Sequence, residues 1–233
     1  MLKKKFQVFV SSTYEDLLDE RQAAVEAILK FGHIPAGMEL FAAGSQSQME
    51  VIREWIDESD IFLLILGGRY GSIDPKTNKS YIELEYEYAI ERDKPFFAVV
   101  MADASLDAKV KDRGQTVLEL DRRDDFKRFR DIVRSKICKS FNDPKTLQAA
   151  IYESLVDIIR KHEDKLSGWV SGRDVQDPGD TLKRFTDLMQ ENQRLREALA
   201  ATKGSRKGES IESASKSTGE GSTGFGRRDL PPP

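Results

Sequence analysis

The feature that most constrains this chain is a short, wholly apolar segment at Ile61–Leu66, with the sequence IFLLIL. Ser59 and Asp60 precede it and Gly67 and Gly68 follow it, so turn-forming residues bound the segment on both sides. The segment is far shorter than the ~20 apolar residues that cross a bilayer. A continuous apolar run of this length is typical of a strand that is buried on both faces, in the middle of a parallel sheet.

The segments around this run alternate between strand-like and helix-like patterns. Short β-branched and aromatic runs predict strands at residues 6–10, 34–39, 61–66, 96–101 and 137–141. Apolar residues at helical spacing predict helices at residues 17–31, 49–58, 81–92, 126–133 and 144–159. Strands and helices that alternate in this way form right-handed βαβ crossovers. We therefore predict an α/β fold, a flavodoxin-like, doubly wound sheet of five parallel strands within one domain at residues 1–166.

The rest of the chain has a different composition. Residues 167–180 are rich in glycine and are expected to form a linker. Residues 181–201 show alternating spacings of three and four, a heptad pattern with the inner positions Phe185, Leu188, Asn192, Leu195 and Leu199. In residues 202–233, many glycines, serines and prolines leave little apolar area to offset the entropy of ordering. We predict a short coiled-coil helix followed by a disordered tail.

Composition argues against several classes of function. The 37 lysines and arginines nearly balance the 40 aspartates and glutamates, and the formal net charge is −3. This balance gives no general attraction to nucleic acid or to an anionic membrane surface. The single cysteine, Cys138, excludes an intrachain disulfide, and two histidines add too few ligands for a conventional zinc site. Because no apolar signal segment follows the basic start, we expect a cytoplasmic protein. We also expect that it uses no metal and no cofactor, and that it binds neither nucleic acid nor a membrane.

Three predicted strands are followed by residues suited to ligand binding. In a doubly wound sheet, ligands bind outside the carboxyl ends of the strands, near the point where the strand order reverses. Hydroxyl groups, helix amino ends and arginines at this edge suit a phosphate-bearing ligand. The candidate substrate-binding residues are Ser11, Ser12, Arg21, Glu39, Arg69 and Tyr70. The plainer alternative is that the Ser-Ser-Thr segment after the first strand caps the first helix, and that Gly67–Gly71 is only a turn.

The third predicted helix places an acidic residue on its apolar side. Three glutamates share the other side and are expected to face solvent: Glu83, Glu87 and Glu91. Glu85 falls among tyrosines and a leucine, where a carboxylate is rarely buried without a partner. One explanation is a structural ion pair with Arg21 or Arg69. The other is a catalytic carboxylate whose pKa is tuned by partial burial.

Four motifs, in order along the chain, resemble those of one family. They are VFVSSTYEDLLDER, GMELF, SDIFLLILGGRYGS and SYIELEYEYAIERDKPFF, and they lie within about residues 5–103. In these motifs the chain resembles the TIR-like domains of the family of unknown function numbered 4062. Similar domains occur at the amino ends of NACHT-type signalling ATPases and in prokaryotic conflict systems. More distantly, the chain is similar to TIR NAD hydrolases and to nucleoside deoxyribosyltransferases.

This resemblance implies a reaction and a catalytic residue. In the distant relatives, a glutamate on the helix before a Lys-Pro strand attacks or stabilises the anomeric carbon of a sugar. Counting back from Lys94 and Pro95, the best match is Glu85, and Glu83 is the alternative because the acidic residues leave the register open. The implied reaction is cleavage of an N-glycosidic bond in a defence or signalling pathway, with NAD or a related nucleotide as substrate. Tyr70 is expected either to stack on the base or to pack in the core.

Two features keep a second function open. The chain has neither the glycine-rich dinucleotide fingerprint nor a P-loop, so no general nucleotide-binding signature supports catalysis. The alternative is a non-catalytic TIR-like signalling or adaptor module that acts through self-association and a signalling partner protein. The heptad pattern at 181–201 predicts a homodimer in which Asn192 meets its own copy, unless this helix packs back on the sheet.

Overall fold

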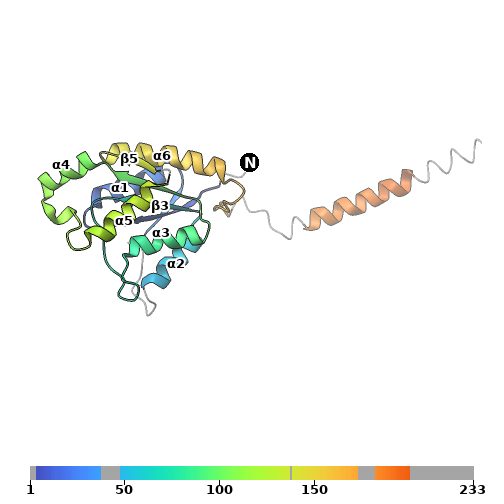
Figure 1. Ribbon diagram of the computed structural model, residues 1–233. Helices are drawn as coiled ribbons and strands as arrows, with labels where there is room; N and C mark the ends of the chain where they lie inside the picture. Colours follow the sequence, from blue (N-terminus) through green and yellow to red (C-terminus); the bar gives the residue numbers. More distant parts are fainter. Residues whose placement is uncertain (1–3, 38–47, 137, 173–181, 200–233) are drawn as a thin grey trace, which may run out of the picture. The chain divides into compact units, whose positions relative to one another are not determined.

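The computed structural model of this protein describes residues 4–37, 48–136, 138–172 and 182–199 (Figure 1). The chain divides into two compact units, Met1–Ser171 and Gly172–Pro233, and each is considered by itself. The predicted tail and most of the predicted linker lie outside the described residues, as does Glu39.

The first unit contains a sheet of five parallel strands. The strands are β1 (Gln7–Ser12), β2 (Ile34–Ala36), β3 (Ile61–Leu66), β4 (Phe96–Met101) and β5 (Cys138–Phe141). Their order is β2-β1-β3-β4-β5, and every neighbouring pair is parallel. The order reverses between β1 and β3, because the chain adds β2 on one side of β1 and β3 on the other. This confirms the doubly wound, flavodoxin-like fold that the sequence predicts.

Helices cover both faces of the sheet (Figure 1). On one face, α1 (Leu18–Lys30) packs against α6 (Pro144–Lys161). The other face is covered by α2 (Gln48–Glu58), α3 (Tyr81–Glu91) and α5 (Arg123–Arg134). Among the described residues of this unit, the other helical segments are α4 (Asp103–Arg113) and a short 3₁₀ turn, η2 (Gln115–Val117).

The apolar sequence of β3 follows from burial on both of its faces. Leu63 and Ile65 belong to the core under α1 and α6, while Phe62 and Leu64 belong to the core under α2, α3 and α5. Successive side chains of a strand point to opposite faces, so each face receives every second residue. Because both faces are covered by helices, no position along β3 is left for a polar residue.

The structure differs from the predicted elements in three places. β1 extends to Ser12, because Ser11 and Ser12 pair with Leu64 and Ile65 of β3, so these two serines are not part of a turn. β2 ends at Ala36 and is shorter than predicted. The sequence pattern did not predict α4, because only one of its residues is buried and the helix therefore has no apolar stripe.

Two helix ends carry residues typical of such positions. Gly32 follows Phe31, the C-cap of α1, and has a φ of +87°, the conformation that favours glycine at a helix end. Asp143 caps α6, and its carboxylate accepts hydrogen bonds from the N–H groups of Lys145 and Thr146, at 2.9 Å each.

The second unit contains a helix at 182–199, and every residue of this helix is exposed. Within the described residues of both units, none of the helices combines the length and the apolar composition that a bilayer crossing requires.

Gly68→Ala should destabilise the α/β unit. A Cβ at this position would collide with the backbone carbonyl of Val117 and with the side chain of Leu106. The Glu119 N–H donates to the Gly68 carbonyl at 2.8 Å and ties the two segments together, so we expect a loss of about 1–3 kcal/mol. Urea titration followed by circular dichroism measures the free energy of unfolding. Gly172→Ala is the matched control, since nothing lies within 4 Å of its added Cβ, and equal stability of both variants would contradict the prediction.

Candidate functional site

A cavity of about 230 Å³ lies at the carboxyl ends of β1 and β3, where the strand order reverses. We call it the switch-point cavity. Its walls are the loops after β1 and β3 and the first turns of α2 and α3, with the lining residues Ser12, Thr13, Tyr14, Glu15, Asp16, Gln48, Arg69, Gly71, Ser72, Tyr81 and Ile82. Gly71 has a φ of +87°, and an added Cβ would lie 2.8 Å from the Thr13 methyl group. The two loops thus approach each other closely where doubly wound sheets bind ligands.

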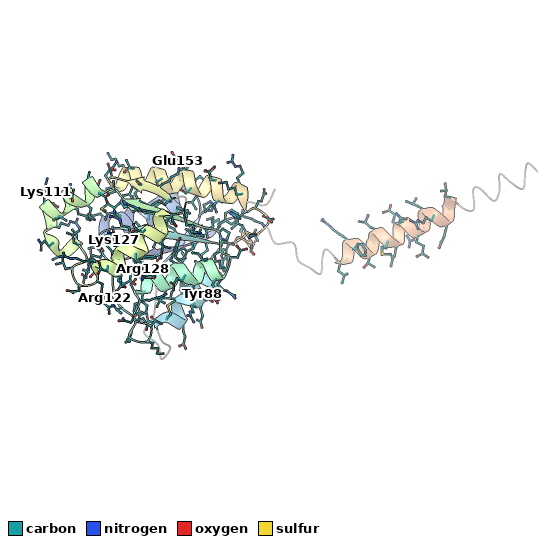
Figure 2. All side chains as sticks on the ribbon, viewed as in Figure 1. Tyr88, Lys111, Arg122, Lys127, Arg128 and Glu153 are labelled. Carbon is teal, nitrogen blue, oxygen red and sulfur yellow. The ribbon has the colours of Figure 1, made fainter. Side chains whose placement is uncertain are left out.

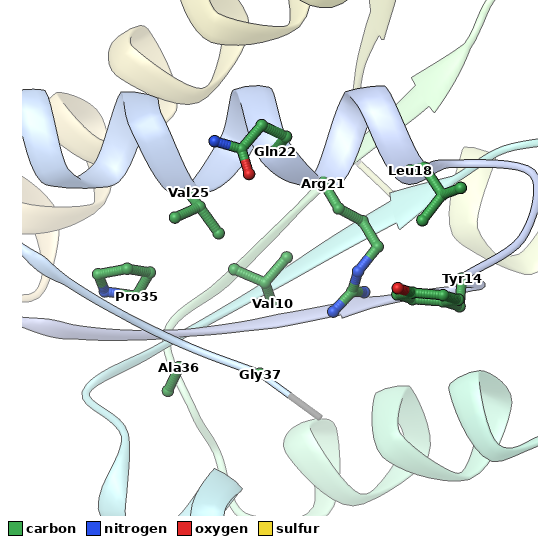
Figure 3. A pocket seen from close by; sticks show the side chains of 9 residues that line it. All are labelled: Val10, Tyr14, Leu18, Arg21, Gln22, Val25, Pro35, Ala36 and Gly37. Atoms are coloured by element: carbon green, nitrogen blue, oxygen red, sulfur yellow. The ribbon is translucent and has the colours of Figure 1, made fainter. Parts of the chain in front are cut away.

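A second cavity, of about 390 Å³, lies between α1 and β2 (Figure 3). Its lining is largely apolar and consists of Val10, Tyr14, Leu18, Arg21, Gln22, Val25, Pro35, Ala36 and Gly37. Arg21 extends from α1 toward the end of β1, next to Tyr14 (Figure 3). Its guanidinium donates to the Ser12 hydroxyl and, at 3.4 Å, to the Ser12 carbonyl. Because Tyr14 lines both cavities, the two cavities adjoin at this side chain.

Glu85 lies on the buried side of α3, as predicted, and only 1% of its surface is exposed. Its Oε1 has no hydrogen-bond partner within the described part of the chain, and the Ser11 hydroxyl oxygen has none either. Burial raises the pKa of Glu85 to about 7, and the Ser11 hydroxyl and the Arg21 guanidinium only partly oppose this rise. Burial of this carboxyl lowers the stability of the folded protein, because no hydrogen bond at Oε1 compensates for the loss of water.

Glu83 is also buried, with 1% of its surface exposed, so the prediction that it faces solvent is wrong. Arg128, which Figure 2 labels on α5, binds both of its carboxylate oxygens, at 2.8 and 3.0 Å. The Tyr70 hydroxyl donates to Oε2. The periodicity of α3 shows which residues share a side, but it does not show that α5 covers that side. Glu83 therefore has the geometry of a structural ion pair with Arg128.

Three predicted binding residues line the cavities. Ser12 and Arg69 line the switch-point cavity, and Arg21 lines the second cavity. The Ser12 hydroxyl accepts from Arg21 and donates to the Thr13 carbonyl at 3.0 Å. Arg69 forms an ion pair with the exposed Glu15, at the mouth of the switch-point cavity, and not with Glu85. These side chains lie where a ligand can contact them.

Two other predicted residues do not line either cavity. Ser11 points to the side of the sheet that carries α3, near Glu85. Tyr70 is 1% exposed and its hydroxyl is bound to Glu83, so its ring packs in the core and is not available to stack on a base. The alternative role of the serines as helix caps is also wrong, because the residue before α1 is Leu17 and makes no side-chain capping bond.

Three residues at the switch-point cavity were not assigned to the site from the sequence. Tyr14 is 60% exposed and offers an aromatic surface. Asp16 is 2% exposed, and among the described residues neither its carboxylate oxygens nor the Thr13 hydroxyl has a hydrogen-bond partner. Burial raises the pKa of Asp16, and the Thr13 hydroxyl is the first of several groups that oppose the rise. The polar sequence after β1 indicates that these residues lie near a ligand site, but only the fold determines which of them is buried.

The arrangement suits a polar organic ligand. It combines two arginines, several hydroxyl groups, an exposed aromatic ring and the buried carboxyl of Asp16, whose pKa is raised; Glu85 lines neither cavity. Arginines and hydroxyls bind phosphate, and carboxylates accept from sugar hydroxyls. Within the described ranges, no three His, Cys, Asp or Glu side chains are grouped so that they could hold a metal ion.

The sheet order and the cavity at its switch point define a doubly wound α/β domain of the flavodoxin-like class. The family model described as Domain of unknown function (DUF4062) matches residues 7–156, and the chain belongs to this family. This confirms the family to which its motifs point. None of the curated proteins matches the chain.

Several solved structures are distantly similar to this chain. A conserved protein from Enterococcus faecalis is 12% identical, with a TM-score of 0.39, and the match covers 64% of this chain and 98% of that one. Two mutants of a flavo di-iron protein from Thermotoga maritima are 13% and 14% identical, with TM-scores of 0.35 and 0.36. These matches cover 69% and 67% of this chain but only 36% of the flavo di-iron chains. Similarity this distant carries no argument about function.

The burial of Glu85 should make stability depend on pH. The carboxyl keeps its proton up to a pKa of about 7 in the folded protein, but ionises near its ordinary value of 4.5 in the unfolded chain. Between these values the folded state binds more protons, so the free energy of unfolding falls as pH rises. Relative to Glu85→Gln, wild type should lose on the order of 3 kcal/mol between pH 4 and pH 8. Urea titrations at several pH values measure this difference.

Glu87→Gln is the control for this experiment, because Glu87 is exposed and bound to Lys79 at 2.6 Å. Its free energy of unfolding should follow wild type at each pH. Parallel curves for wild type and Glu85→Gln would show that the carboxyl of Glu85 has an ordinary pKa.

Arg128→Ala should be much more destabilising than Arg69→Ala. Loss of Arg128 leaves the buried Glu83 carboxylate without its charged partner, at a cost of about 2 kcal/mol. Loss of Arg69 frees an exposed Glu15, and such surface pairs contribute about 0–1 kcal/mol. Chemical denaturation of both variants at pH 7 measures the two losses. A larger loss for Arg69→Ala would mean that Glu83 is not held as described.

Proposed function

We propose that this chain is a nucleotide N-glycosidase domain that hydrolyses the bond between nicotinamide and ribose in NAD, or the equivalent bond of a related nucleotide. The observation that carries the proposal is Glu85, a buried carboxyl with an unpartnered oxygen and a pKa of about 7, beside the end of β1. Carboxyls with a strongly shifted pKa near a ligand-binding crevice are candidates for catalysis, because their burial lowers stability and a function would explain why they are kept. Glu85 is also the position implied by the similarity to TIR NAD hydrolases.

The proposed reaction consumes one water molecule. The bond between ribose C1′ and the nicotinamide nitrogen breaks, both bonding electrons leave with nicotinamide, and C1′ becomes oxocarbenium-like. The Glu85 carboxylate stabilises this positive charge or forms a transient ester. Water then adds to C1′ and a proton is released. Only the ionised carboxylate can act in this way, so a pKa of about 7 predicts activity that increases with pH through this value.

Catalysis requires the substrate to reach Glu85. Ser11 lies next to Glu85, and the following residue, Ser12, lines the switch-point cavity. Arg21, which opposes the rise in the pKa of Glu85, lines the second cavity. Glu85 therefore lies behind residues that line the two cavities. The proposal requires that Arg21 moves when the substrate binds, so that the sugar can contact the carboxylate.

The cavity residues supply binding groups for the remainder of the nucleotide. Arg69 and the hydroxyls of Ser12 and Thr13 suit phosphate oxygens. Tyr14 takes the stacking role that the sequence assigned to Tyr70, because its ring is exposed where the cavities adjoin. Asp16 would accept from ribose hydroxyls and so gain the hydrogen bonds it lacks.

Incubation of the purified full chain with NAD, followed by chromatography for nicotinamide and ADP-ribose, tests this function. Wild type should release nicotinamide, and Glu85→Gln should lower the rate by about 100-fold or more, because the amide cannot carry the negative charge. Glu87→Gln, on the exposed side of α3, should retain the rate of wild type. Equal rates for wild type and Glu85→Gln would remove Glu85 from the mechanism.

A second candidate is a non-catalytic signalling or adaptor module. It is favoured by the 1% exposure of Glu85 and by the exposed apolar side chains on the helix at 182–199. In this alternative Glu85 has no catalytic role, and its raised pKa reflects only the free-energy cost of burying it. Two results together would support this second function over the first. Wild type would cleave neither NAD nor related nucleotides at any protein concentration, and its folding would still depend on pH through Glu85.

A further inference from the structure

The helix at 182–199 exposes an apolar face that nothing covers within the described part of its unit. Between 59% and 67% of the surface of each of its large apolar side chains is exposed: Leu182, Phe185, Leu188, Met189, Leu195 and Leu199. A single helix of this length is marginal in water, and an apolar face of this kind is typical of an interaction surface. We propose that this face pairs with the same helix of a second copy of the chain, as a parallel, in-register, two-stranded coiled coil.

Asn192 supports the parallel orientation. In the heptad, Phe185, Asn192 and Leu199 occupy a positions, while Leu188 and Leu195 occupy d positions. In a parallel pair in register, each a residue meets its own counterpart, so the two Asn192 amides can bond to each other. In an antiparallel pair, a positions lie opposite d positions, and Asn192 would meet a leucine. A buried amide without a partner costs about 1–3 kcal/mol, and this penalty disfavours the antiparallel pair.

The charged residues beside the seam support the same orientation. Glu191 occupies a g position and Arg196 occupies the e position five residues later. In a parallel coil, a g residue faces the e residue of the next heptad on the other helix, so Glu191 pairs with Arg196 of the second copy, twice per dimer. The two residues do not pair within one helix, because positions five apart lie on different sides of it.

The opposite side of the helix is suited to solvent. The outer b, c and f positions are all polar, and Gln193 donates to Glu197 at 3.1 Å on this side. The Thr186 hydroxyl donates to the Leu182 carbonyl at 2.9 Å, so its polar group is satisfied within the helix. The apolar face, which includes Leu182 and Met189 at e positions, lies opposite this polar outer side, as in a two-stranded coil.

The orientation determines which parts of two chains come together. The helix is about 27 Å long and includes fewer than three heptads, so the dimer should be weak and depend on concentration. In each chain the α/β unit precedes the helix. A parallel pair therefore joins two α/β units at the same end of the coil, which raises their concentration relative to each other. An antiparallel pair would join them at opposite ends.

Sedimentation equilibrium of the full chain over a range of concentrations tests the association. Wild type should show a monomer–dimer equilibrium, and Leu188→Glu should shift it to monomer by placing a charge in the seam. Gln190→Glu is the matched control, because it adds the same charge at an outer position and should dimerise as wild type does. A wild-type monomer at all concentrations, a trimer or tetramer, or equal effects of the two variants would overturn the proposal.

Cysteine cross-linking in the full chain tests the orientation. In a Cys138→Ser background, Phe185→Cys and Leu199→Cys should each form disulfide-linked dimers with their own copies. When the two variants are mixed, with one of them tagged, few disulfides should join the Phe185→Cys chain to the Leu199→Cys chain. A majority of such mixed products would show an antiparallel pair and overturn the proposal.

Charge exchange beside the seam gives a second measure of the orientation. Glu191→Arg and Arg196→Glu should each weaken the dimer roughly fivefold, and mixing the two variants should restore it. Failure of the mixture to recover would also count against the parallel pairing.

Discussion

The burial of β3 on both of its faces is the constraint on which the rest of the α/β unit depends. A strand with no polar position must have helices above and below it, and short connections then place α2 and α3 on one side of the sheet and α1 and α6 on the other. The strand order reverses between β1 and β3, and the loops after these two strands line the switch-point cavity. The switch-point cavity is therefore a consequence of the same packing that stabilises the core.

Two carboxyls on α3, two residues apart, are both buried but have different partners. Glu83 is stabilised by a bidentate arginine and a tyrosine hydroxyl, so its burial is compensated locally. Glu85 faces β1, where one of its oxygens has no partner in the described structure and its pKa rises to about 7. The ion pair on one side holds α5 against α3, whereas the perturbed carboxyl on the other side is available for chemistry if a ligand reaches it. The structural ion pair therefore involves Glu83, and the proposed catalytic role concerns Glu85.

The two proposals concern separate units and fail separately. Catalysis depends on Glu85 and on access from the two cavities, whereas self-association depends on the seam at 182–199. A domain of this class that is tethered as a parallel pair presents two copies of the site at one end of the coil. Either activity or partner binding could then respond to dimer formation through effective concentration, without any change in the structure of the α/β unit.

The sequence by itself determined the parts of this protein that depend on local pattern. The apolar runs predicted every strand of the sheet, helical spacing predicted most of its helices, and the motifs identified the family. The tertiary structure decided the partners of the site residues, because helical and strand periodicities show which residues share a side but not what covers it. Arg128 reaches Glu83 from a helix 45 residues away, Tyr70 turns into the core, and Asp16 is buried beside a cavity. Such contacts depend on how distant elements pack, and no local spacing records them.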